Sequence, residues 1–297
     1  MNRWPGIRRS GSTLPQLTLT RHDVRVDRAH VAAYSEVCGF RLRESLPLPY
    51  PHVLAFPLHM ALMTDAAFPF PAVGTVHLEN SITAHRPVSA AERLQLIVRS
   101  ENLRPHPRGR AFDVVTHVHS AGELVWEETS TFLRRGRPQP GAGAGTKPGS
   151  ESGTEELPAA TAAPFPDVAP SGIEWPLAGD LGRRYAAVSG DHNPIHLHAL
   201  TARAFGFRRP IAHGMWSKAR CLGALEGRLP DAVRVDVAFK RPILLPGRVA
   251  FAARTVNDTA DSADSATGTR GTGSYAFSLS DPRSGAPHVL GRTFSAG

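Results

Sequence analysis

The sequence predicts an α+β protein built from two similar units in tandem. A repeat supports this, because Tyr34-Ser-Glu-Val-Cys-Gly-Phe40 matches Tyr185-Ala-Ala-Val-Ser-Gly-Asp191 in the second half. Arg86-Pro-Val88 matches Arg241-Pro-Ile243 at nearly the same offset, and self-similarity at one offset indicates a duplicated unit. The change of composition between the two halves also supports two units. A chain of 297 residues is long enough for two domains.

The first unit, residues 17–135, is predicted to order its elements as strand, helix, loop, helix and four strands. Residues 17–26 alternate as a strand does, and Asp27 is the expected N-cap of a helix through Cys38. Prolines in residues 40–53 predict an irregular loop, and residues 57–65 suit a helix. Alternating patterns predict the remaining strands at residues 74–83, 94–102, 111–120 and 124–134.

Residues 136–171 are rich in Pro, Gly, Ala, Ser and Thr, which predicts a flexible linker. The second unit, residues 172–297, repeats the order of the first, with helices predicted at 181–188 and 213–225. Its strands are expected at residues 234–242, 249–256, 275–280 and 289–294, with a low-complexity loop at 257–273. Pro57-Leu-His-Met60 also resembles the Pro210-Ile-Ala-His-Gly-Met215 run, as a further part of the repeat.

Composition excludes several classes of function. The net charge is +8, but the arginines are scattered, which disfavours a nucleic-acid-binding face and leaves acidic partners open. The chain has no apolar run long enough for a membrane span and no secretory signal, because no apolar stretch follows its basic start. Cys38 and Cys221 have neither metal nor redox spacing, so we expect reduced thiols in a cytoplasmic protein.

The chemistry is concentrated between Tyr185 and Trp216. Asp191-His-Asn-Pro194 is typical of a turn, because Asp and Asn bond back to their own backbone and Pro fixes φ. Asp191 and His196 flank this turn, so a carboxylate and an imidazole can meet at one water or one proton. Pro210 and the His213-Gly214 pair then precede an apolar helix, whose first N–H groups have no internal partner. The stretch therefore offers an acid/base pair and an oxyanion site.

At these residues the sequence resembles a known family. Residues 185–196 read Tyr-x-x-Val-Ser-Gly-Asp-x-Asn-Pro-Ile-His, which is similar to the hydratase-2 motif of the MaoC-like family. The run Pro-Ile-Ala-His-Gly-Met at 210–215 is similar to the family's second signature. The resemblance implies an (R)-specific enoyl-thioester hydratase or 3-hydroxyacyl dehydratase. It also implies a double hot-dog fold, with two antiparallel sheets each wrapping a central helix in a pseudo-dimer.

The resemblance assigns roles to residues of the second unit. His196 and Asp191 are the expected catalytic pair, with the proton handled by each left open, and the backbone of Gly214 is the expected oxyanion donor. The expected supporting residues are Asn193, Ser189, Tyr185 and His213. In the first unit Phe40 stands where Asp191 stands and no Asn-Pro-x-x-His follows. One active site per chain is therefore expected, with the first unit as scaffold and pocket wall.

Alternatives remain open at several positions. Asp191 and Asn193 alone are more often turn formers, and the histidines of residues 192–213 fit no familiar zinc spacing, so no metal is expected. Lys240 and Arg241 are candidates for binding a CoA phosphate or an acidic acyl carrier protein, or form a solvated strand end. No cofactor is expected beyond the CoA or phosphopantetheine arm of the substrate. The protein is predicted to be a monomer or a homodimer.

Two other functions use the same fold. A non-catalytic thioester-binding or assembly subunit would keep the fold, but the presence of Asp191, Asn193 and His196 argues against it. A hot-dog thioesterase would hydrolyse the thioester instead, and the complete hydratase-type turn argues against that. Acyl length and the physiological direction are not readable from the sequence.

Overall fold

The computed structural model describes residues 11–136, 165–166, 168–169, 172–256 and 274–296. The predicted linker at 136–171 lies almost entirely outside these residues, and the predicted loop at 257–273 lies wholly outside them. None of the helices in the described ranges has the length and apolar character needed to cross a membrane.

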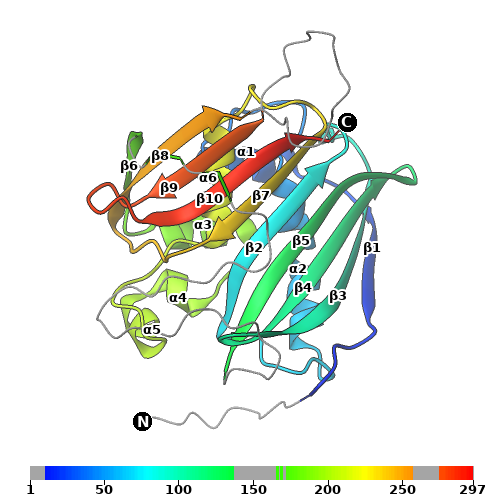
Figure 1. The fold of residues 1–297 in the computed structure, drawn as a ribbon. Helices are drawn as coiled ribbons and strands as arrows, with labels where there is room; N and C mark the ends of the chain where they lie inside the picture. The colour runs from blue at the N-terminus through cyan, green and yellow to red at the C-terminus, as the bar shows by residue number, and fades with distance from the viewer. Residues whose placement is uncertain (1–10, 137–164, 167, 170–171, 257–273, 297) are drawn as a thin grey trace, which may run out of the picture.

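One antiparallel sheet of ten strands runs through the molecule in the order β1-β3-β4-β5-β2-β7-β10-β9-β8-β6 (Figure 1). Each strand of the first half has a counterpart in the second half: β1 corresponds to β6, β2 to β7, β3 to β8, β4 to β9 and β5 to β10. With the strands matched in this way, the order is the same from either edge of the sheet. The halves meet where β2 (Thr75–Ala84) pairs with β7 (Val233–Phe239). The predicted double hot-dog is confirmed, with the two expected sheets joined edge to edge into one.

The other strands complete the two halves. In the first half they are β1 (Thr18–Val24), β3 (Leu94–His106), β4 (Gly109–Ser120) and β5 (Glu123–Arg135). In the second half they are β6 (Ile173–Leu177), β8 (Gly247–Thr255), β9 (Tyr275–Ser280) and β10 (Pro287–Ser295). Nine of these ten strands overlap the predicted ones, whereas β6 was not predicted. Alternation of buried and less buried residues is clearest along β2.

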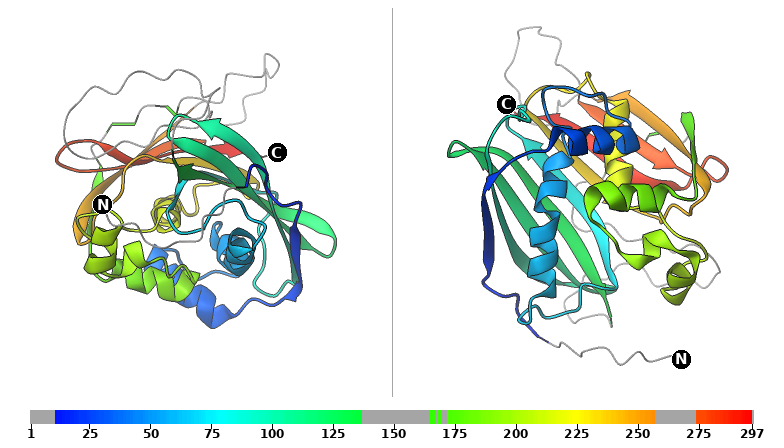
Figure 2. Two further views of the ribbon diagram at one scale, coloured as in Figure 1. Left: turned by 90° about the horizontal axis from the view of Figure 1, so that it is seen from below. Right: turned by 180° about the vertical axis from the view of Figure 1, so that it is seen from behind.

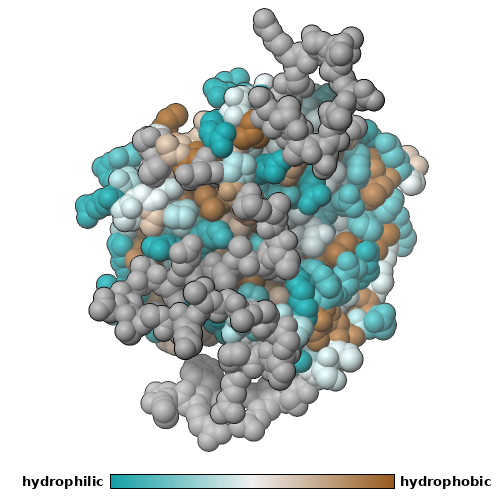
Figure 3. Space-filling view, viewed as in Figure 1, coloured by the Kyte–Doolittle hydropathy of each residue, from teal (hydrophilic) through white to brown (hydrophobic). Residues whose placement is uncertain are grey.

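The helices lie on one face of the curved sheet (Figure 2). They are α1 (Arg28–Cys38), α2 (Tyr50–Thr64), α3 (Leu181–Ser189), α4 (Pro194–Leu197), α5 (Ala199–Ala204) and α6 (Gly214–Ala224). On the opposite face hydrophobic residues are scattered among hydrophilic ones where described residues are visible (Figure 3). The core therefore lies between the sheet and the helices, and one continuous apolar cluster spans both halves.

The repeat has a structural counterpart at the helix ends. Asp27 caps α1 by accepting a hydrogen bond from the N–H of Ala29, as predicted. α1 and α3 both end at a glycine in the left-handed conformation, Gly39 at φ 78° and Gly190 at φ 74°. The repeated tyrosines Tyr34 and Tyr185 meet between the halves with ring centroids 6.3 Å apart.

The central helix of the first unit begins earlier than predicted. α2 starts at Tyr50, so the predicted loop at 40–53 is wrong in its last four residues. Pro51 occupies the first turn, where its missing N–H costs nothing, and Pro57 lies inside the helix. The similar runs around His59 and His213 do not occupy equivalent positions, because His59 lies within α2 whereas His213 is the N-cap of α6.

Candidate active site

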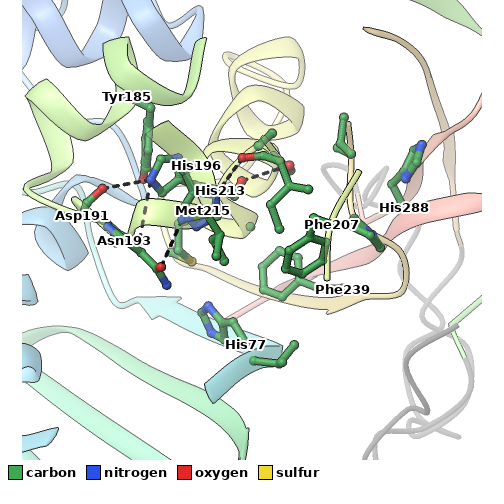
Figure 4. A pocket seen from close by; sticks show the side chains of 18 of the residues that line it. His77, Tyr185, Asp191, Asn193, His196, Phe207, His213, Met215, Phe239 and His288 are labelled. Carbon is green, nitrogen blue, oxygen red and sulfur yellow. Dashed lines mark hydrogen bonds and ion pairs between the residues drawn. The ribbon is translucent and has the colours of Figure 1, made fainter. Parts of the chain in front are cut away.

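A cavity of about 1580 Å³ lies between the two units on the helical side of the sheet. The turn after α3 and the start of α6 line it from the second unit, and α2, β2 and β5 line it from the first. Figure 4 shows Asp191, His196 and His213 gathered at one end of this cavity, with His77 and Phe239 facing them. The sequence-predicted pair and residues of both halves therefore line the same cavity.

The turn after α3 holds Asp191 by a chain of local hydrogen bonds. Gly190 ends the helix in the left-handed conformation, which lets the chain reverse at once. Ser189 Oγ accepts from the Asp191 N–H at 3.2 Å, and Asp191 Oδ1 accepts from the Asn193 N–H at 3.1 Å. Asn193 Oδ1 in turn accepts from the Ile195 N–H and caps the short helix α4. Asp191 thus has a fixed carboxylate, with its side chain 30% exposed at the cavity.

His196 is buried on α4, and its tautomer follows from one contact. Its Nδ1 lies 2.7 Å from the carbonyl oxygen of Ile211. A carbonyl only accepts, so Nδ1 carries the proton and Nε2 of the neutral ring keeps its lone pair. Burial lowers the pKa of His196, an effect that the nearby Asp191 and the Ile211 carbonyl partly oppose. The neutral ring is therefore a base that remains available near neutral pH.

His213 supports the pair. Its Nε2 donates to the Asp191 backbone carbonyl at 3.0 Å and lies 3.8 Å from Asp191 Oδ2. Its ring stacks on His196 with centroids 3.7 Å apart, and Tyr185 covers it at 4.9 Å. Burial and the neighbouring His196 lower the pKa of His213 to about 3, so its ring is neutral. His213 and Tyr185 therefore hold the turn against α4 and α6.

Asp191, His196 and His213 each offer one side-chain ligand atom within 4.8 Å of the others. At this separation one water can bridge the carboxylate and an imidazole nitrogen, since each hydrogen bond spans about 2.8 Å. The same cluster is also close enough to hold a metal ion, although two of its imidazole nitrogens already bond carbonyl groups. The expectation of a metal-free site stays a prediction.

The start of α6 faces the same cavity. His213 is the N-cap residue and makes no side-chain cap, and Gly214 is the first helical residue. The first N–H groups of a helix have no internal acceptor and carry the positive end of its dipole. A Cβ at Gly214 would lie 3.2 Å from the ring of Phe239, so only glycine fits here without displacing that ring. The arrangement can stabilise negative charge on a carbonyl oxygen.

The two predicted substrate-binding residues are placed differently. Arg241 lines the cavity, whereas the Lys240 side chain is not among its lining residues. Two acidic residues accompany six lining arginines, and five of these arginines are exposed. The six are Arg135, Arg208, Arg209, Arg241, Arg248 and Arg283. The open part of the cavity is thus suited to an anionic ligand.

The first unit contributes lining residues that the sequence did not reveal. Phe56 of α2 lies against Gly190, at 3.8 Å from an ideal Cβ built there. His52, His59 and His77 line the cavity as well. Alternation along 74–83 predicted a strand, but no motif marks which of its residues face a cavity shared with the other unit. The sequence similarity around His59 falls inside α2 and does not mark where that helix begins.

Comparisons with known proteins agree with this geometry. The family model described as MaoC like domain matches residues 169–275, which include the whole turn and α6. A 3-hydroxyacyl-thioester dehydratase X of Mycobacterium tuberculosis is 37% identical over 276 residues, covering 93% of this chain and 88% of the relative. The crystal structure of HtdX from the same organism superposes with a TM-score of 0.74 at 34% identity, covering 94% of this chain and all of that one.

More distant relatives show the same local sequence or the same fold. An (R)-specific enoyl-CoA hydratase of Aeromonas caviae is 35% identical over 69 residues, covering 22% of this chain and 52% of the relative. A MaoC-like dehydratase from Phytophthora capsici superposes with a TM-score of 0.67 at 18% identity, covering 95% of each chain. At that identity the likeness concerns the fold alone.

Proposed function

Because the chain belongs to the MaoC-like dehydratase family, we propose that it adds water reversibly to trans-2-enoyl thioesters, giving (3R)-3-hydroxyacyl thioesters. The relatives named for dehydration and hydration of acyl thioesters support this activity. The single observation that carries it is the convergence of the Asp191 carboxylate and the His196 ring at one end of the cavity, with the Nδ1 proton of that ring held by the Ile211 carbonyl.

His196 takes the proton of the attacking water in this proposal. Its Nδ1 is occupied by the Ile211 carbonyl, so Nε2 is the nitrogen that can accept. Asp191 holds the same water through its carboxylate, or returns a proton to C2 of the substrate. Hydrogen bonds donated by the Asn193 N–H to the carboxylate and by His213 Nε2 to the Asp191 carbonyl keep the side chain and its backbone in place.

Gly214 supplies the oxyanion donor in this proposal. Attack at C3 places negative charge on the thioester oxygen, and a helix N-terminus aimed at that oxygen lowers the barrier. The missing Cβ at Gly214 lets the thioester approach the backbone beside Phe239. No metal or redox cofactor takes part, and the substrate carries its own CoA or phosphopantetheine arm.

The arginines of the cavity bind the phosphates of that arm. Arg208, Arg209 and Arg283 are exposed and line the cavity with little negative charge to offset them. Arginine matches phosphate geometry with two parallel N–H donors, which favours this class of ligand. The same charges would attract an acidic acyl carrier protein, so both carriers of the acyl group are substrates to test.

One active site per chain follows from the position of the motif. The corresponding turn of the first unit has Phe40 after Gly39, so it offers no carboxylate. The first unit, residues 17–135, then serves as scaffold and cavity wall, and the second unit carries the reaction. The chain forms a monomer or a homodimer, since its two units already pair internally.

The test follows enoyl absorbance after the protein meets trans-2-enoyl-CoA substrates of several lengths and their carrier-bound forms. The proposal predicts loss of enoyl absorbance, an (R)-3-hydroxyacyl product on chiral analysis, and no release of free thiol. Release of free thiol would instead indicate a thioesterase. No turnover on any of these substrates would favour a non-catalytic binding subunit.

A further inference from the structure

A β-bulge in the first unit turns one side chain into the cavity. Along β2 the residues Asn80, Ile82 and Ala84 face the helices, so strict alternation would point Leu78 the same way. The pairing of β2 with β5 shifts between His77 and Glu79. Beyond this shift Leu78 packs with Leu133 in a separate cluster, and His77 faces the cavity instead. Bulges re-aim side chains in this way next to active sites.

His77 is held in place by aromatic rings but lacks a polar partner. Its ring stacks on Phe132 with centroids 4.6 Å apart and lies 4.9 Å from Phe239, the residue that borders Gly214. Its Nε2 is buried without a hydrogen-bond partner among the described residues. A buried polar atom without a hydrogen-bond partner destabilises the folded protein unless a ligand or a water satisfies it. Figure 4 shows His77 below Asn193 and Met215, facing the catalytic end of the cavity.

Two further imidazoles line the same side of the cavity. His52 Nδ1 bonds the buried carboxylate of Glu128 at 2.9 Å, so its other nitrogen points away from that partner. His59 Nε2 bonds Thr116 Oγ1 at 2.7 Å, whereas its buried Nδ1 has no partner within the residues described. The rings of His52 and His59 meet edge to face at 5.2 Å. We call His52, His59 and His77 the imidazole wall.

The imidazole wall is polar but not cationic at its unpaired positions. Burial, and then the charge of His52, lower the pKa of both His59 and His77 to about 3. A neutral imidazole has one donor and one acceptor nitrogen, which together suit a hydroxyl or a ketone. A plain alkyl chain lying here would leave both buried nitrogens unsatisfied, whereas an oxygen on the chain would satisfy one of them.

We propose that the imidazole wall binds an oxygen substituent on the acyl chain, so that the preferred substrates are oxygenated enoyl thioesters. The inference rests on the proposed hydratase function and names the class of substrate for the same site. His77 is the specificity-determining residue of the wall, because the bulge aims it at the cavity beside Phe239. The first unit thus recognises the acyl chain, while the second unit supplies the residues that catalyse the reaction.

The experiment compares enoyl-CoA pairs of equal length, one unsubstituted and one with a single hydroxyl placed at successive carbons beyond C4. For the wild type, kcat/KM is expected to be about tenfold higher for at least one hydroxylated position, the effect of one hydrogen bond. His77→Phe keeps an aromatic ring between Phe132 and Phe239 and removes both nitrogens. It is expected to abolish this preference, and His77→Gln is expected to restore part of it.

Met63→Leu is the matched control, because Met63 lines the same cavity without a hydrogen-bonding group. It should leave the ratio of the two kcat/KM values unchanged. The proposal is overturned if no hydroxyl position is preferred, or if His77→Phe leaves the preference intact. Turnover by the wild type separates the two claims, since absence of hydration of both members of every pair would refute the hydratase function itself, whereas equal hydration of both would refute only the preference.

Discussion

At the scale of single residues, the protonation state of the His196 ring sets the pH range in which the proposed site is active. Its Nδ1 proton is held by the Ile211 carbonyl, and its buried ring resists gaining a second proton at Nε2. Ser189 and Asn193, predicted as supports, hold the Asp191 backbone and carboxylate by direct hydrogen bonds. The Asp191 carboxylate and the His196 ring are thus positioned by hydrogen bonds to main-chain groups more than by bonds to other side chains.

The pH dependence of kcat/KM tests this assignment. Burial shifts the pKa of His196 below its usual 6.5, so the ring stays neutral to a lower pH than a free imidazole. The rate should be constant near neutral pH and fall as pH decreases through a midpoint below 6.5. Steady-state kinetics from pH 4.5 to 8 measure this midpoint. An acid limb at or above 6.5 would mean that another group is the base.

Gly214→Ala tests the oxyanion site. The new Cβ would lie 3.2 Å from the Phe239 ring, so the ring or the helix start must shift. We expect kcat/KM to fall about 10-fold to 100-fold, because displaced oxyanion donors lose most of their effect. Adding Phe239→Leu makes room for the methyl group and should recover part of the loss. A Gly214→Ala enzyme with wild-type kinetics would remove the helix start from the mechanism.

At the scale of elements, α3 positions His196, the proposed base, through a close contact. A Cβ at Gly182 would lie 2.0 Å from the carbonyl oxygen of His196. No side chain fits there unless α4 moves away from α3. The predicted helix at 181–188 gave the position of Gly182, but this contact between two helices is invisible in the sequence.

Gly182→Ala should therefore reduce activity from outside the cavity. Moving His196 by about 1 Å is expected to lower kcat about 100-fold. Gly179→Ala is the matched control, since a Cβ there meets Pro246 at an ordinary 3.6 Å. Enoyl-CoA kinetics and circular dichroism of both variants measure the effect. Equal activity of the two variants would contradict the role given to α3.

The sequence predicted elements well where their chemistry is local. Asp27 as a helix cap and the alternating strands both depend on neighbouring residues. It predicted poorly where partners distant in sequence decide. α2 begins at Tyr50 because a buried helix tolerates Pro57, and the bulge that turns His77 depends on pairing with β5. The strand predicted at 234–242 ends at Phe239, so Lys240 lies just beyond it, and the sequence pattern did not show which way its side chain points.

At the scale of the whole molecule, a buried polar network ties the two units together. Lys218 of α6 is fully buried and donates to the backbone carbonyls of Asn80 and Val235 and to the Asn80 side chain. The Asn80 amide donates to Glu128, which also bonds His52. Burial lowers the pKa of Lys218 to about 7, an effect that Glu128 opposes. The network thus crosses from the second unit to both layers of the first.

Lys218→Met measures how far this network holds the units together. Methionine leaves the Asn80 and Val235 acceptors without their buried donor and removes a positive charge near Glu128, so the free energy of unfolding should fall by about 3 kcal/mol. The double variant Lys218→Met, Glu128→Gln should lose less than the two single variants added together. Urea unfolding of all four proteins gives the coupling. Strict additivity would show that Lys218 and Glu128 act independently.

The central claim is that one turn of the second unit carries hydration for the whole chain. Its most direct test is the rate of trans-2-enoyl-CoA hydration by the wild type and by Asp191→Asn, with folding of both checked by circular dichroism. Asp191→Asn keeps the shape of the turn but removes the carboxylate charge that acts with His196 on the water. We expect the variant to fold normally and to retain less than about 1% of the wild-type rate. Half or more of the wild-type rate would contradict it and point to a second site in the first unit.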